Sequence, residues 1–209
     1  MNIPVLYEDE WLVALDKPSG LLVIPTPKKE KRTLTSILNE DLKARALPYR
    51  LHPCHRLDKE TSGAIIYAKG KSVQQKMMGL FHGQKVKKRY IAFLQGKPVE
   101  REGEINYRIE GKPAVTYYRV IEQRKEFAVV EAEPLTGRTN QIRIHFKNIG
   151  HPVLGERKFA FRRDFKIRAK RLCLHAKELN FTHPLTGKSL NLAAPLAAEM
   201  VRFLEEHAD

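Results

Sequence analysis

Short apolar runs separated by turn-forming residues predict many short strands in this chain. Two runs, residues 11–15 and 21–24, flank a turn that contains Pro18 and Gly20. A polar loop at residues 55–63 leads directly into the apolar, β-branched residues 64–68, the pattern of a buried strand. Further strands are expected at residues 90–94, 105–109, 115–121, 127–133, 172–174, 178–182 and 190–193.

Helical spacing of apolar residues occurs in four places. Thr33 opens a helix that ends before Pro48, and Ser72 opens a second one. Residues 139–149 fit both periods, but Gly150 and Pro152 just beyond them are a helix stop, so we expect a helix. A final amphipathic helix covers residues 196–207. Strands and helices in no strict alternation predict an α+β fold with a mixed, mainly antiparallel sheet and flanking helices.

Two loops stand out between these elements. Residues 25–32 are rich in Pro and Lys and should be exposed and mobile. Residues 157–171 hold eight Lys and Arg against the single Asp164, interleaved with three phenylalanines. Such a segment is either a solvated face whose phenylalanines enter the core or a surface that binds a polyanion.

The charge of the whole chain favours the polyanion. The 209 residues contain 38 Lys and Arg against 24 Asp and Glu, a formal net charge of +14. A strong positive field of this kind attracts nucleic acid. No apolar run is long enough to span a bilayer and the N-terminus does not read as a secretory signal, so we expect a cytoplasmic protein.

Other kinds of chemistry lack their usual signatures. Cys54 and Cys173 are too few for a disulfide framework, and their spacing to nearby histidines is poor for zinc. The phosphate-binding glycine loops, the dinucleotide fingerprint and the serine nucleophile elbow are absent. We therefore expect no metal and no cofactor.

Asp58 is the central carboxylate of the polar loop before the buried strand. Thr61, Ser62 and Gly63 are turn formers that would fold the backbone tightly just after it. On these local grounds Asp58 is either a turn cap or a carboxylate aimed for chemistry.

Five motifs in order, over residues 6–195, resemble those of the RluA-type RNA pseudouridine synthases. They are Lys17-Pro18-Ser19-Gly20, His55-Arg56-Leu57-Asp58-x-x-Thr61-Ser62-Gly63, Lys88-Arg89-Tyr90, Thr136-Gly137-Arg138 with Gln141-Ile142-Arg143-Ile144-His145, and Leu174-His175-Ala176. The resemblance implies a sheet with flanking helices and an active-site cleft. The chain length and the absence of a linker indicate a single catalytic domain over residues 1–209. The chain departs from many relatives here, because we expect no separate N-terminal RNA-binding domain.

The resemblance further implies a reaction and its residues. Uridine in ribosomal or transfer RNA is cut at its glycosidic bond, and the uracil turns and is rejoined through carbon 5. Asp58 would be the nucleophile, on either the ribose anomeric carbon or carbon 6 of the base. Arg143 would pair with Asp58 and hold it ionised, or else contact a surface phosphate. Tyr90 would stack on the uracil and help to remove the proton from carbon 5.

A base inside folded RNA must be flipped out before it can react. Arg56 would reach into the stack or grip the flipped phosphate, or else form an ordinary ion pair. His55 would only hydrogen-bond the loop. The remaining candidates for RNA contact are Lys85, Lys87, Lys88, Arg89, Arg138, Arg162, Arg163 and Lys166.

Two other functions remain open. A non-catalytic RNA-binding protein could retain the fold, and Asp58 would then be expendable. A hydrolase could use Asp58 on a glycosidic bond, although no second carboxylate suggests a general acid. RNA is the expected partner both of a pseudouridine synthase and of a non-catalytic RNA-binding protein. Neither a membrane nor an obligate protein partner is indicated.

Overall fold

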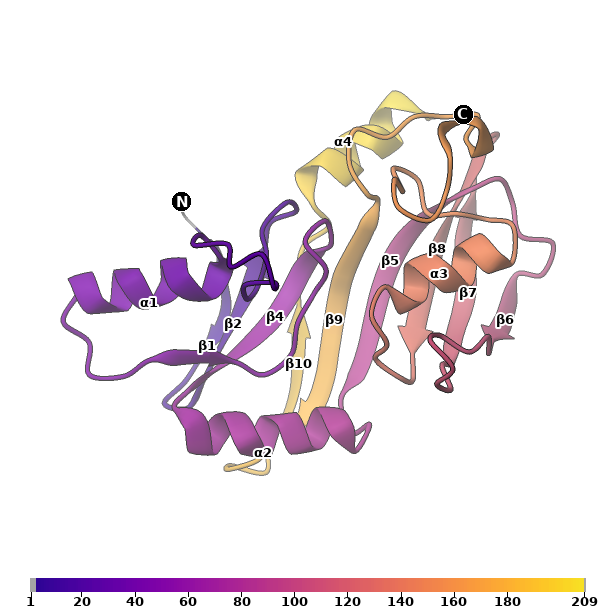
Figure 1. Cartoon of the computed structure of the whole chain (residues 1–209). Helices are drawn as coiled ribbons and strands as arrows, with labels where there is room; N and C mark the ends of the chain where they lie inside the picture. The colour runs from indigo at the N-terminus through magenta and orange to yellow at the C-terminus, as the bar shows by residue number, and fades with distance from the viewer. Residues whose placement is uncertain (1–2, 209) are drawn as a thin grey trace. The chain divides into compact units, whose positions relative to one another are not determined.

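The computed structural model describes residues 3–208, which form two compact units (Figure 1). The first unit consists of residues 3–86 and 178–195, and the second of residues 87–177 and 196–208. Only strand β9 (Leu174–Thr182) is divided between them, after residue 177.

Antiparallel strands form the sheet of the first unit. Its elements are β1 (Val5–Glu8), β2 (Leu12–Lys17), α1 (Leu34–Ala44), β3 (Leu51–Pro53), β4 (Ser62–Lys69), α2 (Lys71–His82), the end of β9, and β10 (Ser189–Ala193). β2 pairs with β1 and β4, β3 pairs with β4, and β10 pairs with β9. The strands predicted at residues 64–68 and 190–193 and both helices are thereby confirmed.

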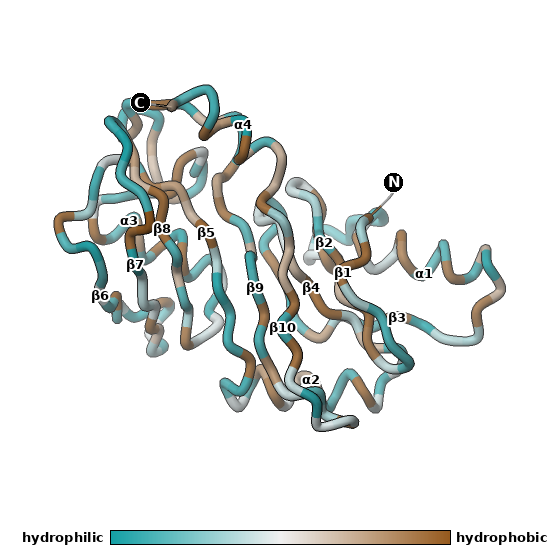
Figure 2. The backbone as a smooth tube through the Cα atoms, turned by 180° about the vertical axis from the view of Figure 1, so that it is seen from behind, coloured by the Kyte–Doolittle hydropathy of each residue, from teal (hydrophilic) through white to brown (hydrophobic). Residues whose placement is uncertain are grey.

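Alternate residues of β4 build the core of this unit. Ala64, Ile66 and Ala68 are fully buried and pack in one cluster with Met77 of α2. In Figure 2, β4 is among the strands with brown stretches, the colour of hydrophobic residues. Because β4 is buried on both faces, its sequence is a continuous apolar run rather than an alternating one.

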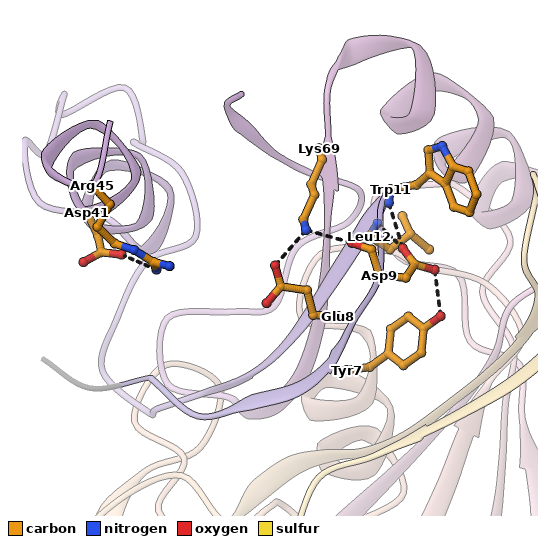
Figure 3. A network of polar contacts seen from close by, with 8 residues as sticks. All are labelled: Tyr7, Glu8, Asp9, Trp11, Leu12, Asp41, Arg45 and Lys69. Atoms are coloured by element: carbon orange, nitrogen blue, oxygen red, sulfur yellow. Dashed lines mark hydrogen bonds and ion pairs between the residues drawn. The ribbon is translucent and has the colours of Figure 1, made fainter. Parts of the chain in front are cut away.

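Asp9 closes the hairpin between β1 and β2 (Figure 3). Its carboxylate accepts hydrogen bonds from the backbone N–H groups of Trp11 and Leu12 and from the Tyr7 hydroxyl, at 2.7 to 2.8 Å. Lys69 of β4 donates to the Asp9 carbonyl and to Glu8, both at 2.7 Å, and so ties the hairpin to the next strand. These bonds fix the register of the edge of the sheet.

The strand predicted at residues 21–24 is wrong, because this segment meets the start of α1 instead. The Leu22 carbonyl accepts from the N–H of Leu34, and the Val23 carbonyl accepts from the N–H of Thr35. A helix leaves its first N–H groups without partners inside the helix, and an apolar segment without strand pairing supplies them here. Thr33 caps the same end, accepting from the N–H of Ser36.

The sheet of the second unit runs in the order β5-β8-β7-β6. Its elements are β5 (Lys87–Gln95), β6 (Glu102–Ile105), β7 (Thr116–Gln123), β8 (Phe127–Pro134), α3 (Gln141–Asn148), the short helix η1 (Arg162–Asp164), the start of β9, and α4 (Ala198–Glu206). The helix chosen for residues 139–149 is confirmed, as is the final helix.

Two details of the strand predictions are wrong. The strand predicted at residues 105–109 ends at Ile105, where its pairing with Thr116 ends, and Ile109 forms only an isolated bridge to Lys112. The observed strand β6 begins before the predicted one. Its polar residues are exposed at the edge of the sheet, where a strand needs no apolar pattern. The two strands predicted at 172–174 and 178–182 are one continuous strand, β9.

Helices cover both faces of this second sheet. Ala92 and Leu94 of β5 pack in one cluster with Phe146 of α3, whereas Phe93 packs in another with Phe203 of α4. Neighbouring residues of a strand point to opposite faces, so α3 and α4 lie on opposite sides. The α+β fold with a mainly antiparallel sheet and flanking helices is confirmed.

Candidate active site

The Asp58 loop joins β3 to β4 in the first unit. Asp58 itself is partly buried, between the exposed Arg56 and the buried Thr61. The N–H of Thr61 donates to the Asp58 carbonyl at 3.1 Å, which makes the tight turn that the sequence predicts. Gly63 follows at a φ of 111°, a conformation that favours glycine over any residue with a side chain.

Lys17 holds this loop from the neighbouring strand. Its side chain is fully buried, and Nζ donates to the carbonyls of Pro18 at 2.9 Å, Leu21 at 2.8 Å and Lys59 at 3.2 Å. The Lys59 carbonyl also accepts from the N–H of Gly20 at 2.8 Å. A buried ammonium needs several acceptors, and here two segments far apart in sequence supply them. The first motif therefore supports the loop that carries Asp58.

His55 has a structural position in the same loop. Its Nε2 accepts the N–H of Ile66 at 3.1 Å, and its ring stacks on Phe81 of α2 with 4.5 Å between centroids. Because a ring nitrogen that accepts from an N–H carries no proton, these contacts describe a neutral imidazole. The sequence suggests a hydrogen bond from His55 to its own loop, whereas this bond joins His55 to strand β4.

Tyr90 lies on β5 in the second unit, opposite Ala132 of β8. It is partly buried and packs against the cluster on the α3 face. Lys88 is two residues earlier and therefore on the same face of the strand. Its Nζ donates to the Thr136 carbonyl at 3.2 Å, and burial lowers the pKa of this amine to about 8.

Gln141 and His145 dock α3 onto β7. Gln141 donates to Thr116 Oγ1 at 3.0 Å and to the Val115 carbonyl at 2.8 Å. His145 bonds Thr116 Oγ1 through Nδ1 and the Tyr107 carbonyl through Nε2, both at 3.0 Å. All three buried polar side chains are thus satisfied within the helix–strand contact. They set the position of Arg143, which lies between Gln141 and His145 on the helix.

The Arg143 guanidinium forms a buried, two-pronged ion pair with Glu156. Nε donates to Oε2 at 2.6 Å and Nη2 to Oε1 at 2.8 Å, and the two residues are 5% and 4% exposed. Burial alone would raise the pKa of Glu156, but hydrogen bonds from Arg143 and from the backbone N–H groups of Lys158 and Phe159 lower it overall. Both groups are therefore charged at neutral pH.

The three predicted catalytic residues are divided between the units, with Asp58 in the first and Tyr90 and Arg143 in the second. Their shared role in catalysis stays a prediction. The sequence missed Glu156, a single acid between an apolar run and the basic segment. No spacing relates it to Arg143, which is 13 residues away in the chain.

The side chains predicted to contact RNA differ in their partners within the protein and in their exposure. Lys87 and Arg89 form ion pairs with Glu133 at 3.3 to 3.4 Å, and Arg138 donates to the Pro113 carbonyl at 3.0 Å. The exposed members of the set are Arg56, Lys85, Lys87, Arg138, Arg162, Arg163 and Lys166.

In the basic segment, Phe161 is 68% exposed, with the Arg163 guanidinium 5.2 Å from its ring centre. Phe159 and Phe165 are partly buried. One aromatic of the segment is thus presented to solvent rather than placed in the core.

Residues 3–208 hold neither a metal-ligand cluster nor a helix suited to cross a membrane. No three His, Cys, Asp or Glu side chains there come together as metal ligands. Among the helices of this part of the chain, none has the length and apolar character needed to cross a bilayer.

Comparisons with known proteins agree with the resemblance in the motifs. The profile of the RNA pseudouridylate synthase family matches residues 11–148. The dual-specificity RNA pseudouridine synthase RluA of Escherichia coli strain K12 is 34% identical over 91% of this chain and 92% of its own length. The uncharacterized RNA pseudouridine synthase YlyB of Bacillus subtilis strain 168 is 32% identical over 98% of this chain and 73% of its own.

A solved structure gives the same answer for the fold. Human RNA Pseudouridylate Synthase Domain Containing 4 superimposes with a TM-score of 0.82 at 27% identity, covering 96% of this chain and 91% of that one. The profile spans more than half of the chain, and relatives above 30% identity span nearly all of it. The chain therefore belongs to the family of RluA-type RNA pseudouridine synthases, which are isomerases that act on RNA.

Proposed function

We propose that this protein converts uridine in ribosomal or transfer RNA to pseudouridine, with Asp58 as the nucleophile. The observation that carries the proposal is the Asp58 loop, which a fully buried lysine and a tight turn hold at the start of a buried strand. A nucleophile gains from such a fixed position, because orientation lowers the entropic part of the barrier. The names of relatives such as RluA support the choice of RNA.

The chemistry balances without a cofactor. Attack by the Asp58 carboxylate on the ribose anomeric carbon or on carbon 6 of the base forms a covalent bond to Asp58 and assists cleavage of the bond between the ribose and nitrogen 1 of uracil. The uracil turns, carbon 5 forms the new bond to the ribose, and the bond to Asp58 breaks and regenerates the carboxylate. The hydrogen on carbon 5 leaves as a proton while nitrogen 1 gains one. We assign the removal of that proton to Tyr90 and the stabilisation of the Asp58 carboxylate to Arg143.

We also propose that the exposed basic side chains contact the RNA backbone. Arg56 is exposed next to the nucleophile loop, and Arg162 and Arg163 are exposed in the basic segment. Lysines and arginines of this kind position a nucleic acid through its phosphates, without reading sequence. RNA as substrate further suggests the cytoplasm as the place of action, with no obligate protein partner.

The test treats unmodified transfer and ribosomal RNA with purified protein and maps pseudouridine by carbodiimide and primer extension. The wild type should form pseudouridine, and Asp58→Ala should form none while its affinity for RNA stays within about threefold. Asp41→Asn is the matched control, because Asp41 is exposed on α1 and pairs with Arg45 at the surface. It should keep full activity.

The same experiment separates the alternatives. Full activity in Asp58→Ala would contradict the proposed nucleophile. RNA binding by the wild type without any pseudouridine would favour a non-catalytic RNA-binding protein, and release of free uracil would favour a hydrolase.

A further inference from the structure

The Arg143 guanidinium donates to two side chains that lie on either side of α3 in the sequence. Asn140 precedes the helix and Glu156 follows it. Glu156 takes the N–H of Nε and one of Nη2, and the Asn140 Oδ1 accepts from Nη1 at 2.9 Å.

Glu156 is itself fixed by the backbone that follows it. Its Oε1 accepts from the N–H groups of Arg157 at 2.9 Å, Lys158 at 2.7 Å and Phe159 at 3.3 Å. The ring of Phe159 lies 5.3 Å from the Arg143 guanidinium carbon and covers it. A carboxylate anchored by three backbone donors cannot follow a moving arginine, so the guanidinium takes its orientation from Glu156.

Asn140 gives up a stabilising role to make its contact. It stands at the N-cap of α3, where an asparagine side chain ordinarily accepts a helix N–H, but it makes no such bond. Its backbone is left-handed, with a φ of 55°, a conformation outside the extended region that an N-cap residue ordinarily adopts. A local rule broken in this way points to a functional site.

We propose that Glu156 and Asn140 are positioning residues that fix the guanidinium plane of Arg143 for the reaction. The inference rests on the role proposed above for Arg143. Because the pair is buried and charge-neutral, Arg143 keeps its charge and its orientation before RNA binds. Neither residue touches the substrate, and both act through Arg143.

The first test is kinetic and uses steady-state, multiple-turnover assays on unmodified transfer and ribosomal RNA. Glu156→Gln keeps the shape but removes the charge and one acceptor, and should lower kcat about 100-fold with KM changed by less than about threefold. Glu156→Asp keeps the charge and should recover part of that loss. Asn140→Gly keeps the left-handed backbone without the acceptor and should lower kcat about tenfold. Glu122→Gln, which removes a surface carboxylate paired with Arg124 on β7, is the control and should be fully active.

A double variant tests whether the effect passes through Arg143. In an Arg143→Met background, Glu156→Gln should lower kcat by less than about a further twofold, because the effects of two residues that act as a unit are not additive. Loss of the same factor in both backgrounds would overturn the inference. So would wild-type kcat in Glu156→Gln.

A spectroscopic measurement on the wild type depends neither on enzyme activity nor on whether any one variant folds. The Nε–H proton of Arg143 in the wild type should exchange slowly with water at neutral pH, and it should exchange rapidly in Glu156→Gln and at an intermediate rate in Glu156→Asp. A wild type that makes no pseudouridine would overturn the proposed function and this inference together. An active wild type with a rapidly exchanging Arg143 Nε–H would overturn the inference alone.

Discussion

At the scale of single residues, Lys88 carries a charge that folding makes costly. Burial lowers the pKa of its amine from 10.5 to about 8, and Nζ has the Thr136 carbonyl as an acceptor. Between pH 8 and 10.5 the unfolded chain therefore binds more protons than the folded one at this site. Stability that depends on Lys88 must then rise with pH in that window and stay lowest below pH 8.

This sign gives a prediction for Lys88→Met, which removes the titrating group. From pH 7.5 to pH 10, the wild type should gain about 1–2 kcal/mol of unfolding free energy relative to the variant. Urea unfolding at several pH values measures the difference, in which the other lysines and tyrosines cancel. A constant difference across this range would mean that the Lys88 amine is not desolvated.

Single residues also show where the sequence was insufficient. The motif around Asp58 predicts its tight turn, because Thr61, Ser62 and Gly63 are turn formers by their own chemistry. Glu156 is the opposite case, because its contact with Arg143 depends on a loop that returns to α3, and no local pattern encodes that return. Lys17 was visible within a motif, but only burial reveals that its charge organises a loop 42 residues away.

At the scale of elements, the turn at residues 17–20 and the Asp58 loop behave as one support. Lys17→Met should lower the unfolding free energy by about 2–4 kcal/mol, because three carbonyls lose the charged donor of a fully buried side chain. Activity should fall further than stability alone explains, since Asp58 loses its fixed backbone. Denaturant melts and initial rates well below the melting temperature measure the two effects separately.

Lys59→Met is the matched control, because its side chain is exposed and only its backbone carbonyl takes part in the support. It should change stability by less than about 0.5 kcal/mol. Equal losses in both variants would contradict the support described for Lys17.

Elements with a clear hydrophobic period could be predicted from the sequence. Elements defined by their hydrogen-bond partners could not. β4 and α1 follow from apolar spacing, because each buries one continuous surface or stripe. Residues 21–24 have the composition of a strand, yet their carbonyls satisfy the first turn of α1. β6 is polar and exposed, so only its pairing with β7 identifies it. Competition for hydrogen-bond partners, which sequence period does not contain, decided both cases.

At the scale of the whole molecule, the net charge of +14 raises the question of whether RNA binding follows total or local charge. The basic segment 157–171 carries eight of the 38 Lys and Arg and presents Phe161 to solvent. Lys43 in the last turn of α1 and Arg45 at its C-cap are exposed without a comparable cluster. Removing two charges from either place changes the net charge equally, so the two changes separate the possibilities.

We predict that local charge decides. Arg162→Ala with Arg163→Ala should weaken RNA binding and reduce the slope of log K against log salt by about 1–2, as expected when two phosphate contacts are lost. Lys43→Ala with Arg45→Ala should leave the slope within about 0.3 of the wild type, because a screened charge beyond about 10 Å contributes little at 0.1 M salt. Binding titrations of the unmodified RNA between 50 and about 300 mM salt measure both slopes. Equal slope changes in the two variants would show that the overall field, rather than the basic segment, holds the RNA.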